Sequence, residues 1–161
     1  MNQKGEPEAR FVALKEVSEA GFTFCSAFDS PKGVEIDANS KVALTFWWDH
    51  IGRQVRVVGT ATRISDKEAD RYFAERRKDA QLTSLVSKQS QPLERPETLE
   101  ARPREARMQF EGQEVPRPEK WGGYCVKPER LEFLTFKANR LHERTLFTRK
   151  AGGWSKQRLQ P

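Results

Sequence analysis

The sequence predicts a mainly β fold, in which an antiparallel sheet forms a small barrel decorated by helices. Short apolar runs, rich in aromatic and β-branched residues, recur along the chain and are separated by turn residues. Two segments with helix-start signals interrupt these runs. The 161 residues suit one domain over 1–161, because a chain of this length can bury roughly two-thirds of its unfolded surface.

The first half of the chain contains four strand-like runs. Residues 11–14 and 22–25 are short and apolar, and residues 18–21 between them supply a turn, so a hairpin is expected. Residues 42–48 form a third run. The fourth, residues 53–63, alternates, with Val55, Val57, Gly59 and Ala61 on one face and Gln54, Arg56, Val58, Thr60 and Thr62 on the other.

Two serines in this half are expected to open helices. Ser30 followed by Pro31 fits an N-cap with proline at the first helical position. Ser65 is followed three residues later by a glutamate, which fits a capping box, and its helix should run to about Arg77. A further helix is expected over residues 79–87.

The stretch from residue 91 to 120 is rich in proline, glutamate and arginine. It is predicted to be a loop or a broken helix within the same domain, because Pro103 disrupts any continuous helix. Strands are expected again after it, in four short runs at 123–126, 131–134, 145–147 and 154–158.

The charge of the chain favours an anionic partner. Its net charge is +6, from 29 basic and 23 acidic residues, and phosphate-bearing small molecules, nucleic acid and acidic proteins all fit this sign. Acidic residues are mixed among the basic ones, so no polybasic tail indicates nucleic acid. No apolar run approaches the ~18 residues that span a bilayer, and the polar first eight residues lack the apolar core of a signal peptide.

Cys25 and Cys125 each lie in an apolar strand-like run. They indicate reduced thiols in a cytosolic protein, and neither their spacing nor the two histidines of the chain predict a metal site. The sequence also contains no Ser/His/Asp order, paired-carboxylate pattern or G-x-G-x-x-G motif. If the chain is an enzyme, its chemistry should therefore come from a phosphate-bearing cofactor.

The predicted helix start at Ser30 is a candidate phosphate site. Its free N–H groups, the charge of Lys32 and a close ligand approach at Gly33 all favour an anion, although Asp29 opposes one. An ordinary helix start that binds only water is the alternative.

Two pairs of residues could add to such a site. Arg10 and Lys15 bracket the first strand on opposite faces, so they can serve one ligand only if the strand bulges; otherwise they are surface cations. Tyr72 and Arg76 share one face of the predicted second helix and could clamp a phosphate. A Tyr–Arg stack on an ordinary amphipathic helix is the alternative for this pair.

The segment 139–144 is predicted to be a strand that places Arg140, His142 and Arg144 on one face. Such a row of cationic groups suits either solvent on an edge strand or a bound anion. Less specific candidates, with amide or hydroxyl groups, are Gln54, Gln89 and Ser90.

These segments occur together, and in this order, in one known family. The sequence resembles the pyridoxamine (pyridoxine) 5′-phosphate oxidase family, which binds flavin mononucleotide (FMN), over about residues 5–161. The matching segments are Arg-Phe-Val-Ala-Leu-Lys (10–15), Ser-Pro-Lys-Gly (30–33), Arg-Gln-Val-Arg-Val (53–57), Tyr-Phe-Ala-Glu-Arg (72–76), Ser-Lys-Gln-Ser (87–90), Trp-Gly-Gly-Tyr (121–124), Arg-Leu-His-Glu-Arg (140–144) and Gly-Trp-Ser-Lys-Gln-Arg-Leu-Gln-Pro (153–161).

The resemblance implies an antiparallel Greek-key split β-barrel with peripheral helices, in one FMN-binding domain that forms a homodimer with the flavin at the interface. It further implies a flexible start (1–8), a loop or helical excursion (91–120) and a C-terminal dimerisation region (121–161). The flavin contacts that it implies are Arg10, Lys15, Ser26, Lys32, Gln54, Gln89, Ser90 and Arg144. The substrate contacts are Lys15, Tyr72 and Arg76 at the phosphate, with Arg140 and His142 as the catalytic pair that faces the pyridine ring.

The sequence departs from the family pattern at several of these places. Pro31 stands where the family usually has arginine, which removes one flavin-phosphate contact. Cys25 replaces an aromatic residue, Ala80 replaces a serine of the substrate-phosphate clamp, and Leu134 replaces a tryptophan beside the flavin. Relative to the family, the sequence is N-terminally shortened by the leading helix and the first barrel strand. A fragment, a misassigned start and a shortened homologue all fit this, and an absent barrel strand is expected to expose a sheet edge.

The activity implied by the resemblance is that of a cytoplasmic FMN-dependent oxidase. It would convert pyridoxamine 5′-phosphate or pyridoxine 5′-phosphate to pyridoxal 5′-phosphate, with O2 reduced to H2O2; Arg140 would position the reacting carbon and His142 would orient the substrate. Two alternatives stay open: a related flavin oxidase of secondary metabolism of the phenazine type, and a non-catalytic binder of FMN or pyridoxal phosphate. Neither nucleic acid nor a membrane is an expected partner.

Overall fold

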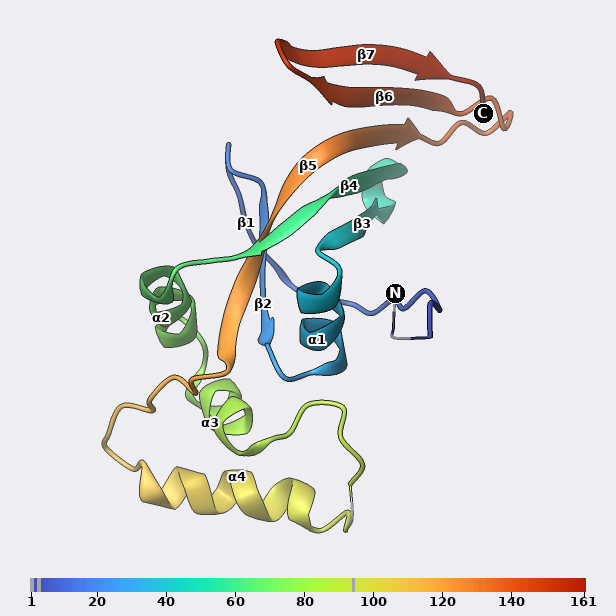
Figure 1. The fold of residues 1–161 in the computed structure, drawn as a ribbon. Helices are drawn as coiled ribbons and strands as arrows, with labels where there is room; N and C mark the ends of the chain where they lie inside the picture. The colour runs from blue at the N-terminus through green and yellow to red at the C-terminus, as the bar shows by residue number, and fades with distance from the viewer. Residues whose placement is uncertain (1, 3, 94) are drawn as a thin grey trace.

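The fold is organised around one long strand, β5 (Trp121–Thr135), which is hydrogen-bonded to three others. The structure, a computed structural model, describes residue 2, residues 4–93 and residues 95–161. One edge of β5 pairs along most of its length with β4 (Arg53–Arg63). The other edge pairs first with β2 (Phe22–Ala27) and then with β6 (Glu143–Lys150), so the sheet divides near the middle of β5 (Figure 1).

The remaining strands extend the sheet on its outer sides. β1 (Leu14–Val17) lies beside β2, β3 (Lys41–Trp48) beside β4, and β7 (Gly153–Leu159) beside β6. The seven strands of the described residues all pair in antiparallel fashion. The predicted mainly β fold is therefore confirmed, and the open sheet is that of a split barrel rather than a closed one.

The alternation of apolar and polar side chains along β4 shows which face of the sheet packs against the core. Val55, Val57, Gly59 and Ala61 are buried, as the sequence predicts, and they pack with Phe24 and Val126 from the neighbouring strands. Burying each large aliphatic side chain of this kind stabilises the fold by roughly 1.5–3 kcal/mol. The opposite face of β4 is consequently available for polar side chains.

One strand replaces two in the second half of the chain. The sequence predicts separate strands at 123–126 and 131–134, which is wrong, because β5 runs through both. Gly59 is paired with Pro128 and Val58 with Arg130, which leaves Glu129 as an extra residue in a β-bulge. The bulge accommodates the proline inside a central strand, and Gly59 is required opposite it because a Cβ there would lie 2.2 Å from the Lys127 carbonyl oxygen.

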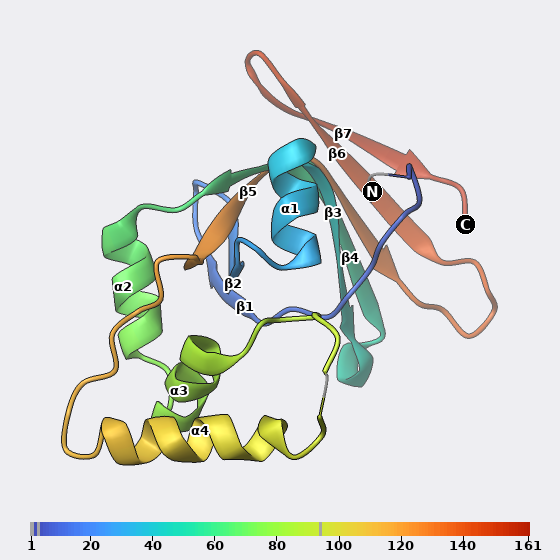
Figure 2. The ribbon, with the colours of Figure 1, turned by 60° about the horizontal axis from the view of Figure 1, so that its bottom comes forward.

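In the part of the chain that the structure describes, four α-helices accompany the sheet. α1 (Pro31–Ala38) is capped by Ser30 and α2 (Asp66–Ala74) has the predicted capping box at Ser65, although it ends three residues earlier than expected. α3 (Lys78–Val86) and α4 (Thr98–Gln109) follow, and a short 3-10 turn (Asp49–Ile51) joins β3 to β4. Figures 1 and 2 show α2, α3 and α4 gathered at one end of the sheet and the β6–β7 hairpin at the other.

Pro103 lies inside α4 without breaking it. The prediction of a loop or broken helix for this part of the 91–120 stretch is therefore wrong. Proline costs a helix interior about 3 kcal/mol, but α4 packs against α3 and buries Ala106 in a second core cluster with Leu82 and Trp121. This tertiary packing offsets the local penalty.

Residues 1, 3 and 94 lie outside the description, so the flexible start expected over residues 1–8 is described only in part. Within the described residues, no helix has the length and apolar character needed to cross a membrane.

Candidate functional site

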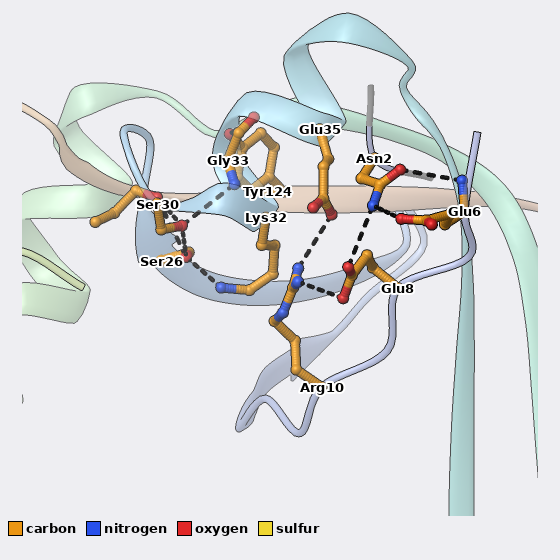
Figure 3. A network of polar contacts seen from close by, with 11 residues as sticks. Asn2, Glu6, Glu8, Arg10, Ser26, Ser30, Lys32, Gly33, Glu35 and Tyr124 are labelled. Carbon is orange, nitrogen blue, oxygen red and sulfur yellow. Dashed lines mark hydrogen bonds and ion pairs between the residues drawn. The ribbon is translucent and has the colours of Figure 1, made fainter. Parts of the chain in front are cut away.

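The N-terminus of α1 forms a small polar cradle from Arg10, Ser26, Ser30 and Lys32, here called the α1 cradle. The Lys32 ammonium donates to the Ser26 hydroxyl at 2.5 Å, and the Ser26 and Ser30 hydroxyl oxygens lie 3.4 Å apart (Figure 3). Ser30 Oγ also accepts a hydrogen bond from the Gly33 N–H at 3.2 Å, which closes the first turn of the helix. β2 and α1 thus bring hydroxyl and ammonium groups to one point.

The charge of the α1 cradle is only partly balanced. Lys32 is half-buried, and burial, followed by the nearby charge of Arg10, lowers the pKa of its ammonium. Arg10 is paired with Glu8 and Glu35, each at 3.1 Å, whereas no carboxylate of the described residues lies within ion-pair distance of Lys32. A half-buried cation at a helix N-terminus is suited to a phosphate group.

Gly33 has a different role from the one expected. The sequence suggests that it allows a ligand to approach the backbone. A Cβ at this position would instead lie 2.2 Å from the Phe28 carbonyl oxygen, so glycine is required by the packing of α1 on the preceding loop.

A bulge redirects Lys15. Leu14 is paired with Phe24 and Glu16 with Thr23, so Lys15 is the extra residue in β1. This is the irregularity that the sequence requires if Arg10 and Lys15 are to serve one ligand. Lys15 lies near Cys25. Burial raises the pKa of the Cys25 thiol, and the charge of Lys15 partly opposes this rise.

Tyr72 and Arg76 do not share a helix face, because α2 ends at Ala74. The buried Tyr72 donates its hydroxyl hydrogen bond to the Glu16 carboxylate at 2.5 Å, and burial together with this bond raises the pKa of Tyr72 to about 12. The Tyr–Arg stack exists, but Arg71 forms it, 4.3 Å from the ring centroid.

Arg76 instead reaches α3 and the start of β5. Its Nη2 donates to the Ala80 carbonyl and to the Ser84 hydroxyl, each at 3.1 Å, and its guanidinium lies 5.2 Å from the Trp121 ring centroid. Arg76 also lies near Cys25, as Lys15 does. Lys15, Tyr72 and Arg76 therefore surround one region where β1, β2, α2 and α3 meet, here called the α2–α3 clamp.

At the far end of β5, Gln54, Leu134 and Arg144 lie in one row across β4, β5 and β6. Gln54 is paired with Leu134, and Leu134 with Arg144, so their side chains share a face. We call these three residues the β4–β6 row. Arg144 is half-buried and points toward Glu132, two residues before Leu134.

Glu132 is a buried carboxylate between two arginines. Arg144 lies 2.8 Å from one of its oxygens, and Arg56 is hydrogen-bonded to the other. Burial works to raise the pKa of Glu132, but the hydrogen bonds from Arg144 and Arg56 outweigh it and hold this pKa below its usual value. Glu132 therefore fixes Arg144 within the row.

The strand predicted for 139–144 is wrong over most of its length. β6 begins only at Glu143, and Arg140 lies in a turn with φ +65°. The Asn139 side chain accepts from the Leu141 N–H at 3.1 Å, which stabilises the turn. Arg140, His142 and Arg144 consequently do not share a strand face.

His142 has a defined orientation despite lying outside the strand. Its Nδ1 accepts a hydrogen bond from the Lys137 N–H at 3.1 Å, and the centroids of the His142 and Phe136 rings are 4.6 Å apart. The proton of the neutral ring is therefore on Nε2, which can donate to a ligand.

The α1 cradle and the β4–β6 row are far apart within one chain. Ser26 is paired with Gly122 and Gln54 with Leu134, and these two β5 positions are twelve residues apart in sequence, which corresponds to about 40 Å along the strand. The structure brings together Arg10, Ser26 and Lys32, and separately Gln54 and Arg144. The exposed Gln89 and Ser90 lie in the loop after α3, where Ser90 has φ +64°.

Sequence reasoning missed Glu16, Ser84 and Glu132 as partners of the candidate site residues. The helical spacing of α3 could have suggested Ser84 as a partner, because residues four apart, such as Ala80 and Ser84, lie on the same face of a helix. Glu16 and Glu132 meet Tyr72 and Arg144 only through strand pairing and helix docking, for which the sequence contains no local signal.

Comparisons with known proteins agree with this architecture. Residues 1–110 match the family model described as pyridoxamine 5′-phosphate oxidase, and residues 121–161 match the pyridoxine 5′-phosphate oxidase C-terminal dimerisation region. The pyridoxine/pyridoxamine 5′-phosphate oxidase of Rubrobacter xylanophilus is 50% identical over 157 residues, 98% of this chain and 72% of that protein. The protein of the same name from Sphingopyxis alaskensis is 47% identical over 157 residues, 98% of this chain and 73% of that protein.

Solved structures show the same fold. PhzG from Burkholderia lata, in complex with tetrahydrophenazine-1-carboxylic acid, superposes with a TM-score of 0.94 at 28% identity, over 100% of this chain and 79% of PhzG. A pyridoxamine 5′-phosphate oxidase-related, FMN-binding protein from Nostoc punctiforme superposes with a TM-score of 0.80 at 15% identity, over 99% of this chain and 83% of its own. The family predicted from the sequence is confirmed: this chain belongs to the pyridoxamine 5′-phosphate oxidase family.

Proposed function

We propose that this chain is an FMN-dependent oxidase that converts pyridoxamine 5′-phosphate or pyridoxine 5′-phosphate to pyridoxal 5′-phosphate, with O2 reduced to H2O2. The observation that best supports this is the α1 cradle, where the half-buried Lys32 and two serine hydroxyls converge and no carboxylate of the described residues lies within ion-pair distance of the lysine. The names of the relatives at 50% and 47% identity support the same activity.

The residues of the α1 cradle fit the phosphate of FMN. Lys32 supplies a cation, Ser26 and Ser30 supply hydroxyl groups, and α1 adds the partial positive charge of its N-terminus. Pro31 contributes no N–H donor and no charge, so Lys32 is the principal contact. When bound, FMN supplies the chemistry of the reaction, namely hydride acceptance from the substrate and reoxidation by O2.

A second copy of the chain is needed to complete the site. About 40 Å along β5 separates the α1 cradle from the β4–β6 row, which supports a flavin site shared by two chains. Large apolar side chains around the row also remain exposed, as a subunit interface requires. They include Trp47, Trp48, Phe133 and Phe136. We therefore propose a homodimer in which residues 121–161 form the dimerisation region and each flavin lies between the cradle of one copy and the row of the other.

The chain's own residues bind and orient the substrate in this arrangement. Lys15, Tyr72 and Arg76 in the α2–α3 clamp hold the substrate phosphate, and Tyr72 exchanges its bond to Glu16 for one to that phosphate. Arg140 and His142 of the other copy face the pyridine ring. His142 Nε2 donates to the substrate while Nδ1 keeps its bond to Lys137, which fixes the angle of the ring.

An absorption spectrum and a peroxide assay test the proposal. Purified protein should bind FMN with an absorption band in the flavin region, and it should release H2O2 with pyridoxamine 5′-phosphate. A protein that binds FMN without releasing H2O2 would be a non-catalytic binder. Arg140→Ala should lower turnover while FMN stays bound; unchanged turnover would show that Arg140 does not have the proposed role.

The phenazine-type oxidase is the second candidate, supported by the similarity to PhzG. Ala80 is the residue of this chain that favours it, because it replaces a serine of the substrate-phosphate clamp, whereas the retained Tyr72 and Arg76 favour a phosphorylated substrate. Faster oxidation of a reduced, non-phosphorylated tricyclic substrate than of pyridoxamine 5′-phosphate would favour this candidate. For either activity we propose a cytoplasmic location, which the unpaired thiols of Cys25 and Cys125 support.

A further inference from the structure

Arg76 differs from the other half-buried arginines of the chain. Three arginines of the described residues are half-buried: Arg76, Arg117 and Arg144. Arg117 is paired with Asp66 and Asp70, and Arg144 with Glu132, whereas Arg76 has no carboxylate within ion-pair distance in the described part of the chain. A positive charge removed from water in this way requires an anion to offset its desolvation.

The guanidinium of Arg76 is nevertheless held in place. Nη2 donates to Ser84 Oγ and to the Ala80 carbonyl oxygen, each at 3.1 Å, and the Trp121 ring lies 5.2 Å away. Nε is buried and has no hydrogen-bond partner among the described residues. Nη2 is therefore fixed by protein, whereas Nη1 makes no hydrogen bond among the described residues, is not buried, and remains for a ligand.

The Ser84 hydroxyl is itself oriented by α3. It donates its hydrogen to the Ala80 carbonyl oxygen at 2.9 Å, so its lone pairs are directed toward other donors. Arg76, Ser84 and the Ala80 carbonyl thus form a closed triangle of hydrogen bonds. Ala80 offers only its backbone oxygen to this triangle, so the hydroxyl comes from the residue one helical turn later.

We propose that Ser84 is a positioning residue: it fixes the Arg76 guanidinium so that Nη1, which donates to none of the described residues, faces the phosphate of the substrate, and thereby determines the preference for phosphorylated substrates. This inference rests on the proposed function of the α2–α3 clamp. Ser84 acts through Arg76, and its loss should weaken phosphate binding without changing the chemistry at the pyridine ring.

The chain offers a matched control in the neighbouring residue. Thr83 also lies in α3 and also donates to the carbonyl oxygen four residues earlier, that of Asp79, at 2.8 Å. It is exposed, however, and within the described residues its hydroxyl is not hydrogen-bonded to Arg76. Thr83→Ala therefore removes an equivalent hydroxyl without affecting the triangle. Ser84→Thr keeps the hydroxyl at the triangle.

The experiment compares holoprotein of the wild type with Ser84→Ala, Ser84→Thr and Thr83→Ala. Two quantities are measured: the Kd of pyridoxal 5′-phosphate by equilibrium dialysis, and kcat and KM for pyridoxamine 5′-phosphate and for non-phosphorylated pyridoxamine. Ser84→Ala should raise the Kd and the KM of the phosphorylated compounds roughly five- to twentyfold and leave kcat within about twofold. Ser84→Thr and Thr83→Ala should match the wild type, and no variant should change KM for pyridoxamine.

Two results would overturn the inference: an unchanged Kd in Ser84→Ala, or an equal rise in KM for pyridoxamine. If Ser84→Ala does not fold, Ser84→Cys replaces it, because a thiol of similar size is a weaker hydrogen-bond partner and should raise the Kd in the same direction. A wild type that binds pyridoxal 5′-phosphate but does not oxidise pyridoxamine 5′-phosphate refutes the proposed function alone, since the Kd series still decides the role of Ser84. A wild type that binds neither compound refutes both.

Discussion

Replacing Glu132 by glutamine should destabilise the protein at neutral pH and remove part of its acid sensitivity. The Glu132 side chain is only 8% exposed and contacts Arg56 and Arg144, whose side chains are 48% and 25% exposed. Removing one partner from a fully buried ion pair costs about 3–5 kcal/mol. Because both arginines retain access to water, which screens their charges, we expect a loss of about 2–3 kcal/mol for Glu132→Gln.

The pH dependence follows from the lowered pKa of Glu132. Its folded-state pKa lies below the unfolded value, so its contribution to stability is present above the unfolded pKa, near 4.5, and is lost as pH falls through the folded pKa. Urea unfolding at a fixed protein concentration, at pH 7 and pH 4, measures both effects. The wild type and Glu132→Gln should differ most at pH 7 and converge at lower pH. Equal unfolding midpoints of the wild type and Glu132→Gln at pH 7 would show that the ion pairs of Glu132 do not stabilise the fold.

Three further predictions concern the tyrosines, α1 and its cradle. The chain has two tyrosines, and the pKa of both Tyr72 and Tyr124 is raised to about 12. Ultraviolet titration of the folded protein should therefore show little tyrosinate near pH 10, and the free energy of unfolding should fall as pH rises from about 10 through 12. Titration of both tyrosines near pH 10 would contradict this. Gly33→Ala should destabilise the protein by about 2 kcal/mol or more in urea unfolding, because its Cβ would meet the Phe28 carbonyl oxygen at 2.2 Å; Gly152→Ala, with open space around it, is the control. Lys32→Met should weaken FMN binding at least tenfold in a fluorescence titration, with unfolding stability little changed; unaltered affinity would exclude the α1 cradle as the phosphate site.

Local sequence signals predicted the elements that depend on local chemistry. The alternation from Arg53 to Arg63 coincides with β4, and the serine caps at Ser30 and Ser65 begin α1 and α2. The α4 helix was missed because the cost of Pro103 is local, while the packing on α3 that offsets it is not. The turn at Arg140 was missed because three cations at spacing two suggest a strand, whereas Asn139 stabilises a turn instead.

The candidate site was predictable in its residue types but not in its arrangement. Periodicity placed Gln54 on a polar face, yet only strand pairing aligns it with Leu134 and Arg144. Likewise, no spacing in the sequence indicates that Glu16 binds Tyr72 or that Glu132 holds Arg144. The separation of the α1 cradle from the β4–β6 row depends on the length of β5, which the sequence analysis had divided into two strands.

In the proposed dimer, each site combines the α1 cradle of one copy with residues from the far end of β5 in the other. Mixed dimers of Lys32→Met and Arg140→Ala, isolated through two different affinity tags, test whether two copies share a site. If the site forms between copies, the mixed dimer has one intact site and one doubly altered site, so it should show about half of the wild-type turnover although both parent dimers are impaired. A mixed dimer no more active than its parents would contradict the account, because it would place both residues in a site formed within one chain.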